Sequence, residues 1–227
     1  MQIIVHPPKF IRNFFKHYIW KITPENDQKI LYITIDDGPI PEMTPNTLKL
    51  LKRYNAKATF FCVGENVTKY PDIYNQIIRE GHSVGNHTFN HLKGMITKTK
   101  NYIENIKLAD NYIKTNLFRP PHGRIKNRET SQIISNKQII MWDILSKDYD
   151  KKITPIQCWL NVEKNISSGS IIVFHDNIKA LENQRYALEK TLQVYSGKGY
   201  QFKPLPDGYN NLGYINPKTK MIVYNNN

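Results

Sequence analysis

The sequence is poor in cysteine and contains no long apolar run. Its two cysteines, Cys62 and Cys158, form no Cys-x-x-Cys motif and are too few for a disulfide framework. Cys62 lies within the apolar segment "ATFFCV", which is typical of a small core residue. No apolar stretch reaches the length of about 18 residues that a membrane-spanning helix needs. These absences exclude a disulfide-stapled scaffold and an integral helical membrane protein.

The N-terminal region lacks the features of a secretory signal. Residues 1–20 are basic, but they contain neither a continuous apolar stretch nor a small-residue cleavage site. We therefore expect no signal peptide, and a location either in the cytoplasm or peripherally at the cell envelope.

Acidic residues are few, and basic residues are not clustered. The 32 Lys and Arg residues outnumber the 19 Asp and Glu residues, which gives a formal net charge of +13. This balance favours an anionic partner such as a cell-wall polymer or an anionic lipid, or it serves only solubility. No run of five basic residues and no nucleic-acid-binding signature is present, so we predict no nucleic-acid partner.

The chain has the size and composition of one soluble domain. It has 227 residues, of which 40% are hydrophobic and 22% charged, and no internal repeat. Short strand-like segments alternate with longer helical ones. The strand-like segments are 30–36, 58–63, 82–86, 117–119, 138–142, 170–175 and 200–205. The helical segments are 44–54, 66–80, 98–114, 127–136, 154–166 and 181–195.

This alternation predicts an α/β fold, because strands separated by helices form parallel βαβ units. Seven strands suggest a distorted or incomplete (β/α)7–8 barrel. We expect a catalytic domain at 30–205, preceded by an N-terminal amphipathic segment at 1–29. Residues 206–227 form a C-terminal tail, in which "NPKT" suggests a small hairpin.

The N-terminal segment has the pattern of an amphipathic helix. Its large apolar residues fall on one helical face: Phe10, Ile11, Phe14, Phe15, Tyr18 and Ile19. Basic residues surround that face: Lys9, Arg12, Lys16 and Lys21. We expect this helix to pack on the domain, at the end opposite the polar strand ends. Binding to an anionic membrane surface is the less favoured alternative.

Residues able to do chemistry follow several of the predicted strands. Asp36 and Asp37 follow the first, and two adjacent buried carboxylates are costly unless a cation compensates them. His87 and His91, after the third strand, have the i, i+4 spacing that would place both imidazoles on one face of a helical turn. The segments "RPPHG", "WDILSKDY" and "FHD" follow later strands. Because active sites of parallel α/β barrels lie at the C-terminal strand ends, these residues are expected to meet there.

Each of these motifs has an ordinary structural explanation when it is taken alone. A His-x-x-x-His pair usually consists of two surface histidines, and Asp-Asp-Gly-Pro is typical of a turn. Arg-Pro-Pro is typical of an extended loop, and a histidine that ends an apolar strand can be a core residue. The shared position at strand ends is what favours one common site.

The motifs also resemble, in order, those of the polysaccharide deacetylases of carbohydrate esterase family 4, over residues 30–203. The resemblance implies the following roles. "TIDDGP" would supply the catalytic base Asp36 and the metal ligand Asp37, and "HTFNH" the ligands His87 and His91. "RPPHG" would supply Arg119, which orients the base, and a backbone amide at His122 that helps to hold the oxyanion. "VFH" would supply the general acid His175, and Asp148 would orient it.

The resemblance further implies a bound divalent metal and an acetylated substrate. An Asp-His-His set leaves open positions, as in catalytic zinc sites, and it also admits Co, Mn, Fe or Ni. Four residues are expected to contact substrate: Pro121, His122, Tyr149 and Val173. His122 stands where the family usually has Tyr or Phe, and Tyr149 where it has Trp.

The expected function is therefore metal-dependent removal of N-acetyl groups from a glycan such as peptidoglycan or a chitin-like oligosaccharide, with release of acetate. Two alternatives remain open. One is an O-acetyl esterase acting on a polysaccharide such as xylan, which the same residues could serve. The other is a catalytically silent glycan-binding relative, which the presence of base, ligands and acid disfavours.

Overall fold

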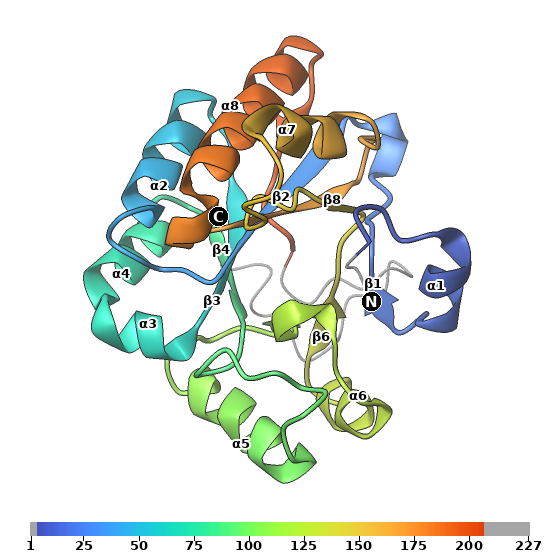
Figure 1. Cartoon of the computed structure of the whole chain (residues 1–227), viewed down its shortest axis with the longest axis vertical. Helices are drawn as coiled ribbons and strands as arrows, with labels where there is room; N and C mark the ends of the chain where they lie inside the picture. Colours follow the sequence, from blue (N-terminus) through green and yellow to red (C-terminus); the bar gives the residue numbers. More distant parts are fainter. Residues whose placement is uncertain (1–3, 207–227) are drawn as a thin grey trace.

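The computed structural model describes residues 4–206 and has one parallel sheet that curls into a half-barrel (Figure 1). The strands run in the order β1-β6-β5-β4-β3-β2-β8-β7, and β9 pairs with β2. Their bounds are β1 (Tyr18–Ile19), β2 (Ile30–Asp36), β3 (Ala58–Cys62), β4 (Ser83–Asn86), β5 (Leu117–Phe118), β6 (Gln138–Ile140), β7 (Ile144–Leu145), β8 (Ile171–His175) and β9 (Gln201–Phe202).

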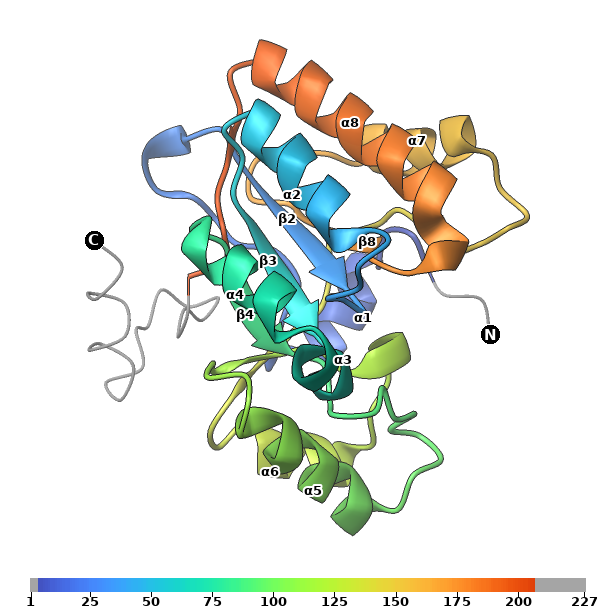
Figure 2. The ribbon, with the colours of Figure 1, turned by 90° about the vertical axis from the view of Figure 1, so that its left-hand side faces the viewer.

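Helices surround the outside of the curled sheet (Figure 1, Figure 2). The α-helices are α1 (Lys9–Phe14), α2 (Thr44–Arg53), α3 (Gly64–Lys69), α4 (Pro71–Arg79), α5 (Thr99–Asp110), α6 (Asn127–Ile133), α7 (Pro155–Glu163) and α8 (Leu181–Gly197). Three short 3₁₀ turns complete the described elements: η1 (Glu25–Asp27), η2 (Pro121–Gly123) and η3 (Ile178–Ala180). The predicted incomplete barrel of parallel strands is confirmed.

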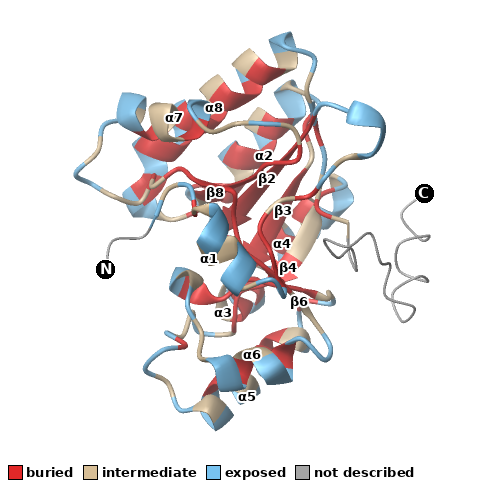
Figure 3. Cartoon of the chain, turned by 90° about the vertical axis from the view of Figure 1, so that its right-hand side faces the viewer, coloured by how far each residue is buried: buried red, intermediate tan, exposed pale blue. Residues whose placement is uncertain are grey.

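The central strands β2, β3 and β8 are buried on both faces over almost their whole length (Figure 3). All seven residues of β2 are buried. Because successive side chains of a strand point to opposite faces, Leu31, Ile33 and Ile35 pack towards the helices. Ile30 and Tyr32 belong to a separate cluster on the other face. The same alternation carries Asp36, at the C-terminal end of β2, to that second face.

The sequence patterns located most elements but missed some boundaries. The helix expected over 66–80 is two helices, because Pro71 starts α4 directly after α3 ends at Lys69. The two-residue strands β1 and β7 were not predicted. Two residues are too few for any alternation to show, so pairing with neighbouring strands is what defines them.

The N-terminal segment differs from the predicted helix. Helix α1 ends at Phe14, and Tyr18 and Ile19 pair with β6 instead. The aromatic and β-branched run "YIW" favours a strand, and its residues are buried there, with exposed fractions of 6% for Tyr18, 4% for Ile19 and 7% for Trp20. Phe10 and Phe14, expected on the packed face, are 72% and 78% exposed.

We expect Trp20→Ala to destabilise the protein strongly, because its buried indole packs with Tyr18 in a core cluster that also contains residues of β5 and β6. Truncation of a buried Trp costs about 3–5 kcal/mol. Phe10→Ala is the matched control, and its effect should stay within about 0.5 kcal/mol since the ring is exposed. Urea unfolding monitored by circular dichroism measures both. Equal effects would contradict this assignment of buried and exposed aromatic residues.

The proposed hairpin in the C-terminal tail lies outside the described residues. No helix within residues 4–206 combines the length and the apolar character needed to cross a membrane. The division into an N-terminal segment, a domain at 30–205 and a tail stays a prediction.

Candidate active site

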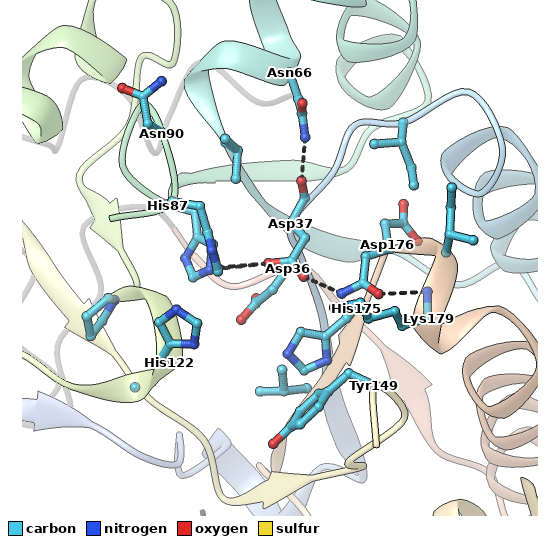
Figure 4. A pocket seen from close by; sticks show the side chains of 18 of the residues that line it. Asp36, Asp37, Asn66, His87, Asn90, His122, Tyr149, His175, Asp176 and Lys179 are labelled. Atoms are coloured by element: carbon cyan, nitrogen blue, oxygen red, sulfur yellow. Dashed lines mark hydrogen bonds and ion pairs between the residues drawn. The ribbon is translucent and has the colours of Figure 1, made fainter. Parts of the chain in front are cut away.

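Most of the residues predicted to act together line one pocket of about 780 Å³ at the C-terminal ends of the strands (Figure 4). It is lined by Asp36 at the end of β2, Asp37 directly after it, His87 and His91 after β4, and His175 at the end of β8. Arg119 and Asp148 lie behind these residues, almost fully buried. The expectation that several strand ends contribute to one site therefore agrees with the geometry.

Asp36 and His175 are direct neighbours across two strands. They are register partners in the parallel pair β2–β8, so both side chains point to the same face of the sheet. Asp36 is 4% exposed, and its Oδ1 accepts a hydrogen bond of 2.6 Å from Nη1 of Arg119. The sheet itself thus places a carboxylate and an imidazole side by side.

Arg119 is held in a fixed position by four acceptors. Its Nη1 also donates to the hydroxyl of Thr34 at 2.8 Å, and its Nε and Nη2 donate to the carbonyls of Ile140 and Met141 at 3.2 and 2.8 Å. The guanidinium lies over the ring of Phe61, 4.1 Å from the ring centroid. A guanidinium held by four hydrogen bonds can fix the orientation of the Asp36 carboxylate.

Asp37 is held so that one carboxylate oxygen has no protein donor. Asn177 donates to its Oδ2 at 2.7 Å, and Asn66 donates to its backbone carbonyl at 2.8 Å. The backbone of Asp37 has φ 77°, a left-handed conformation that is costly for a residue other than glycine. Its Oδ1 is buried without a hydrogen-bond partner and lies 3.2 Å from Nε2 of His91 and 3.7 Å from Nε2 of His87.

His87 and His91 meet through a loop and not, as the spacing suggested, through a helical turn. Thr88 and His91 have φ values of 63° and 54°, which no α-helix contains. The loop is fixed by side chains: the amide of Thr88 donates to Asn86 Oδ1 at 2.8 Å, and the amide of Phe89 donates to Asn105 Oδ1 at 2.8 Å. The i, i+4 spacing therefore identified the correct pair of histidines, but a loop and not a helical turn brings them together.

The three side chains fit a divalent cation. One ligand atom from each of Asp37, His87 and His91 lies within 4.8 Å of the others, and the orphaned Oδ1 of Asp37 faces both imidazoles. Burial lowers the pKa of His87 to about 4, so its ring is neutral at physiological pH. Its Nδ1 donates to the carbonyl of Arg119 at 2.7 Å, which leaves the Nε2 lone pair available. For Asp37, burial would raise the pKa, but the close approach of His91 and the charge of His175 lower it.

His175 is paired with a buried carboxylate. Its Nδ1 and Oδ1 of Asp148 are 2.7 Å apart, and its backbone amide donates to Oδ2 of Asp148 at 2.7 Å. Burial alone would lower the pKa of His175, but the charge and hydrogen bond of Asp148 raise it to about 9. With Nδ1 occupied, Nε2 is the atom that can deliver a proton to the pocket.

The predicted substrate contacts are only partly placed as expected. His122, Tyr149 and Val173 line the pocket, and the Tyr149 and His175 rings meet edge to face with centroids 4.8 Å apart. Pro121, in the η2 turn, is not among the lining residues whereas the neighbouring Pro120 is, so the contact of Pro121 with substrate stays a prediction. The exposed His122 ring approaches His91 at 4.8 Å between centroids.

Sequence reasoning gave no role to two residues that follow His175. Asn177 holds the Asp37 carboxylate, and its Oδ1 accepts from the amide of Lys179 at 3.0 Å. Asp176 is fully buried and accepts hydrogen bonds from Thr47 and Gln184. Burial raises the pKa of Asp176 to about 7, against the hydrogen bonds of Thr44 and Thr47. Nothing in the sequence points to Asp176 and Asn177 except that they directly follow His175, which ends a strand.

We expect Asn177→Ser to weaken metal binding by about 10- to 100-fold, as loss of a group that orients a metal ligand typically does. Serine can still accept from the amide of Lys179 but cannot reach Asp37, so the turn remains capped. Competition with a chromophoric chelator measures the metal dissociation constant. Thermal melting of the metal-free variant serves as the control. An unchanged affinity for the metal would mean that Asn177 only caps the turn and does not position Asp37.

Comparison with known proteins gives a consistent result. The sequence profile described as polysaccharide deacetylase matches residues 23–141. A peptidoglycan-N-acetylglucosamine deacetylase of Bacillus cereus is 35% identical over 191 residues, which cover 81% of this chain and 88% of the relative.

Two solved structures have the same fold. The crystal structure of a peptidoglycan N-acetylglucosamine deacetylase in complex with 4-naphthalen-1-yl-N-oxidanyl-benzamide has a TM-score of 0.75 and 30% identity, covering 86% of this chain and 94% of that one. The peptidoglycan deacetylase PdaC from Bacillus subtilis has a TM-score of 0.72 and 28% identity, covering 81% and 90%.

Proposed function

The chain belongs to the polysaccharide deacetylase family, and from this premise we propose that it removes N-acetyl groups from peptidoglycan and releases acetate. It is a hydrolase that acts on a C–N bond other than a peptide bond. The curated relative and both solved relatives are named as peptidoglycan deacetylases, and the family match covers the strands that carry Asp36, Asp37, His87, His91 and Arg119.

One observation carries the proposal: a base, a candidate cation site and an acid lie together in one pocket. Asp36 and His175 are cross-strand neighbours, and the Asp37–His87–His91 cluster lies beside them. Hydrolysis of an acetamide needs a group that accepts a proton from water and a group that protonates the departing amine. A binding module would need neither.

Asp37, His87 and His91 would hold a divalent metal, and we favour zinc because imidazole and carboxylate ligands suit it; Co, Mn, Fe or Ni would fit the same donors. When bound, the cation supplies Lewis acidity that activates water and polarises the acetyl carbonyl. Asn177 fixes the Asp37 carboxylate so that Oδ1 faces the two imidazoles.

We assign the proton transfers to Asp36 and His175. Oδ1 of Asp36 accepts from Arg119, so its Oδ2 is the atom that takes the proton of the attacking water. The His175 ring, protonated because of Asp148, gives the proton on Nε2 to the sugar nitrogen as the C–N bond breaks. The backbone amide of His122 would help to hold the carbonyl oxygen as it gains negative charge. The products are acetate and a free amine.

The substrate suggests where the protein works. Peptidoglycan is an anionic cell-wall polymer, and the net charge of +13 suits such a partner. We therefore place its working site at the cell wall. Tyr149, Val173 and His122 would line the sugar that carries the acetyl group.

The decisive experiment measures acetate release from a panel of acetylated glycans: peptidoglycan, a chitooligosaccharide and acetylated xylan. We expect release from peptidoglycan by zinc-loaded protein and none after chelation. Release from xylan alone would identify an O-acetyl esterase. No release from any glycan, with metal bound, would overturn the proposal.

A further inference from the structure

A second groove, of about 630 Å³, adjoins the catalytic pocket and is built in part by the N-terminal segment. Its lining includes Ile11 and Phe14 from α1 and Met95 from the loop that follows His91. His122, Gly123 and Trp142 line both this groove and the catalytic pocket. The expectation that the N-terminal segment lies at the end away from the site is therefore wrong.

Large apolar side chains are exposed in this groove and at residues next to its lining in the sequence. In and directly after α1, Ile11 and Phe15 pack against the core, whereas Phe10 and Phe14 are 72% and 78% exposed. Ile96, next to Met95, is 80% exposed. Exposure of this kind is costly in water unless another surface covers it. We call the region formed by residues 4–24, 92–103 and 119–128 the N-terminal patch.

The three segments of the N-terminal patch meet in space. Lys126 donates to the carbonyl of Thr97, which joins the second segment to the third. A Cβ added at Gly94 would lie 2.8 Å from the carbonyl oxygen of Arg124, so the same two segments are in close contact there. Ile4, Met95 and Ile125 line the groove together, which joins the first segment to both.

The N-terminal patch also contains no acidic residue, although the chain has 19. The first acidic residue after each segment lies just beyond its end: Glu25, Glu104 and Glu129. Basic residues lie in all three segments: Lys9, Arg12, Lys16, Lys21, Lys93, Lys98, Lys100, Arg119, Arg124, Lys126 and Arg128. Arg12, Lys126 and Arg119 are paired with carboxylates, but Lys9, Lys16 and Lys93 are exposed.

We propose that the N-terminal patch docks on an anionic lipid bilayer, with Phe10, Phe14 and Ile96 inserted at the headgroup level. Protruding phenylalanine and isoleucine side chains beside lysines are the combination that binds such an interface. A sugar polymer would be served better by flat, partly sheltered aromatic faces and hydrogen-bonding groups. Docking in this way would hold the adjoining catalytic pocket close to the membrane surface.

The test is co-sedimentation of the full chain with vesicles of phosphatidylglycerol and phosphatidylcholine in equal amounts. We expect binding that weakens as the salt concentration rises, and little binding to pure phosphatidylcholine. The double variant Phe10→Ser/Phe14→Ser should bind at least about tenfold more weakly. The matched control is Ile78→Ser/Ile156→Ser, which changes exposed apolar residues on α4 and α7 and should bind as the wild type does.

A charge variant separates electrostatic from apolar contributions. Lys9→Glu/Lys16→Glu should abolish the preference for anionic vesicles, whereas Lys151→Glu/Lys152→Glu, with the same change in net charge, should leave most of it. Thermal melting checks that every variant is folded.

Four results would overturn the proposal. Two concern vesicles: no binding to anionic vesicles, or equal losses of vesicle binding in Phe10→Ser/Phe14→Ser and in its Ile78→Ser/Ile156→Ser control. In the third, Phe10→Ser/Phe14→Ser sediments less than the wild type with isolated peptidoglycan but equally well with vesicles. This result would identify the N-terminal patch as a polymer contact. In the fourth, concentration-dependent dimers disappear in Phe10→Ser/Phe14→Ser, which would identify it as an interface between two copies. None of these readouts depends on deacetylase activity.

Discussion

Asp36→Asn is expected to lower turnover of an acetylated glycan by about 10³-fold or more while leaving metal binding unchanged. The substitution removes the proton acceptor but none of the three ligand atoms. Asparagine removes the negative charge but keeps an oxygen that can accept from Arg119, whose guanidinium is 1% exposed and would otherwise lose this hydrogen-bond acceptor. Elemental analysis of the purified variant and steady-state acetate release measure the two effects separately.

Asp37→Asn is the natural counterpart, because it changes the neighbouring carboxylate by the same single atom. It should weaken metal affinity severely, and the lost activity should return at least partly at high metal concentration. Asp36→Asn should show no such rescue. The reverse pattern would mean that the two carboxylates have exchanged roles. A melting temperature for each metal-free variant distinguishes either effect from simple unfolding.

The second large effect is expected at His175, and it should depend on the leaving group. His175→Asn should lower kcat/KM for an acetamide by about 10²- to 10⁴-fold, because the departing amine must be protonated. A p-nitrophenyl ester should lose less than about tenfold, since its phenolate leaves without a proton. Asparagine is preferred to alanine because it can still donate to the buried Asp148. Equal losses on both substrates would remove His175 from the role of acid.

The same residue predicts the behaviour at high pH. The pKa of His175 is raised from 6.5 to about 9, so the acid is available below that value and lost above it. Amide hydrolysis should therefore fall as pH rises towards about 9, and positive charge in the neighbouring metal site would move this limb lower.

The stability of the metal-free protein should also fall at high pH. A group whose pKa is higher in the folded state stabilises it below the unfolded value of 6.5, and this stabilisation is lost as pH rises through about 9. His175→Asn should flatten that part of the stability profile. A decline of equal size in the variant would assign it to other groups.

Much of the fold and most of the site could be predicted because the signals are local. The apolar run that forms β2, and the carboxylates directly after it, lie within one short segment. The histidine spacing identified the correct pair even though Thr88 and His91 adopt left-handed conformations. Side chains of neighbouring residues, not periodicity, fix that loop, so no spacing rule could reveal its shape.

What could not be predicted depends on contacts between distant residues. Asn177 and Asp37 are 140 positions apart. No sequence pattern around Asn177 indicates that its side chain binds the carboxylate that follows β2. The helix predicted in the N-terminal segment was too long for a related reason. Its apolar residues fit a helical face, but β6 offers an open strand edge that captures Tyr18 and Ile19, and only the assembled sheet contains that edge.

The Arg119–Asp36 pair has a consequence for how the chain folds. Its partners are 83 positions apart, and Arg119 also needs Thr34 and the carbonyls of Ile140 and Met141. Before β2, β5 and β6 have come together, a guanidinium in that position would be buried without its acceptors, which is strongly unfavourable. Closure of such long loops is also entropically expensive. The pair should therefore form late in folding, and sheets that lack one of these strands should be unstable. An intact catalytic centre then requires β2, β5 and β6 to be fully assembled.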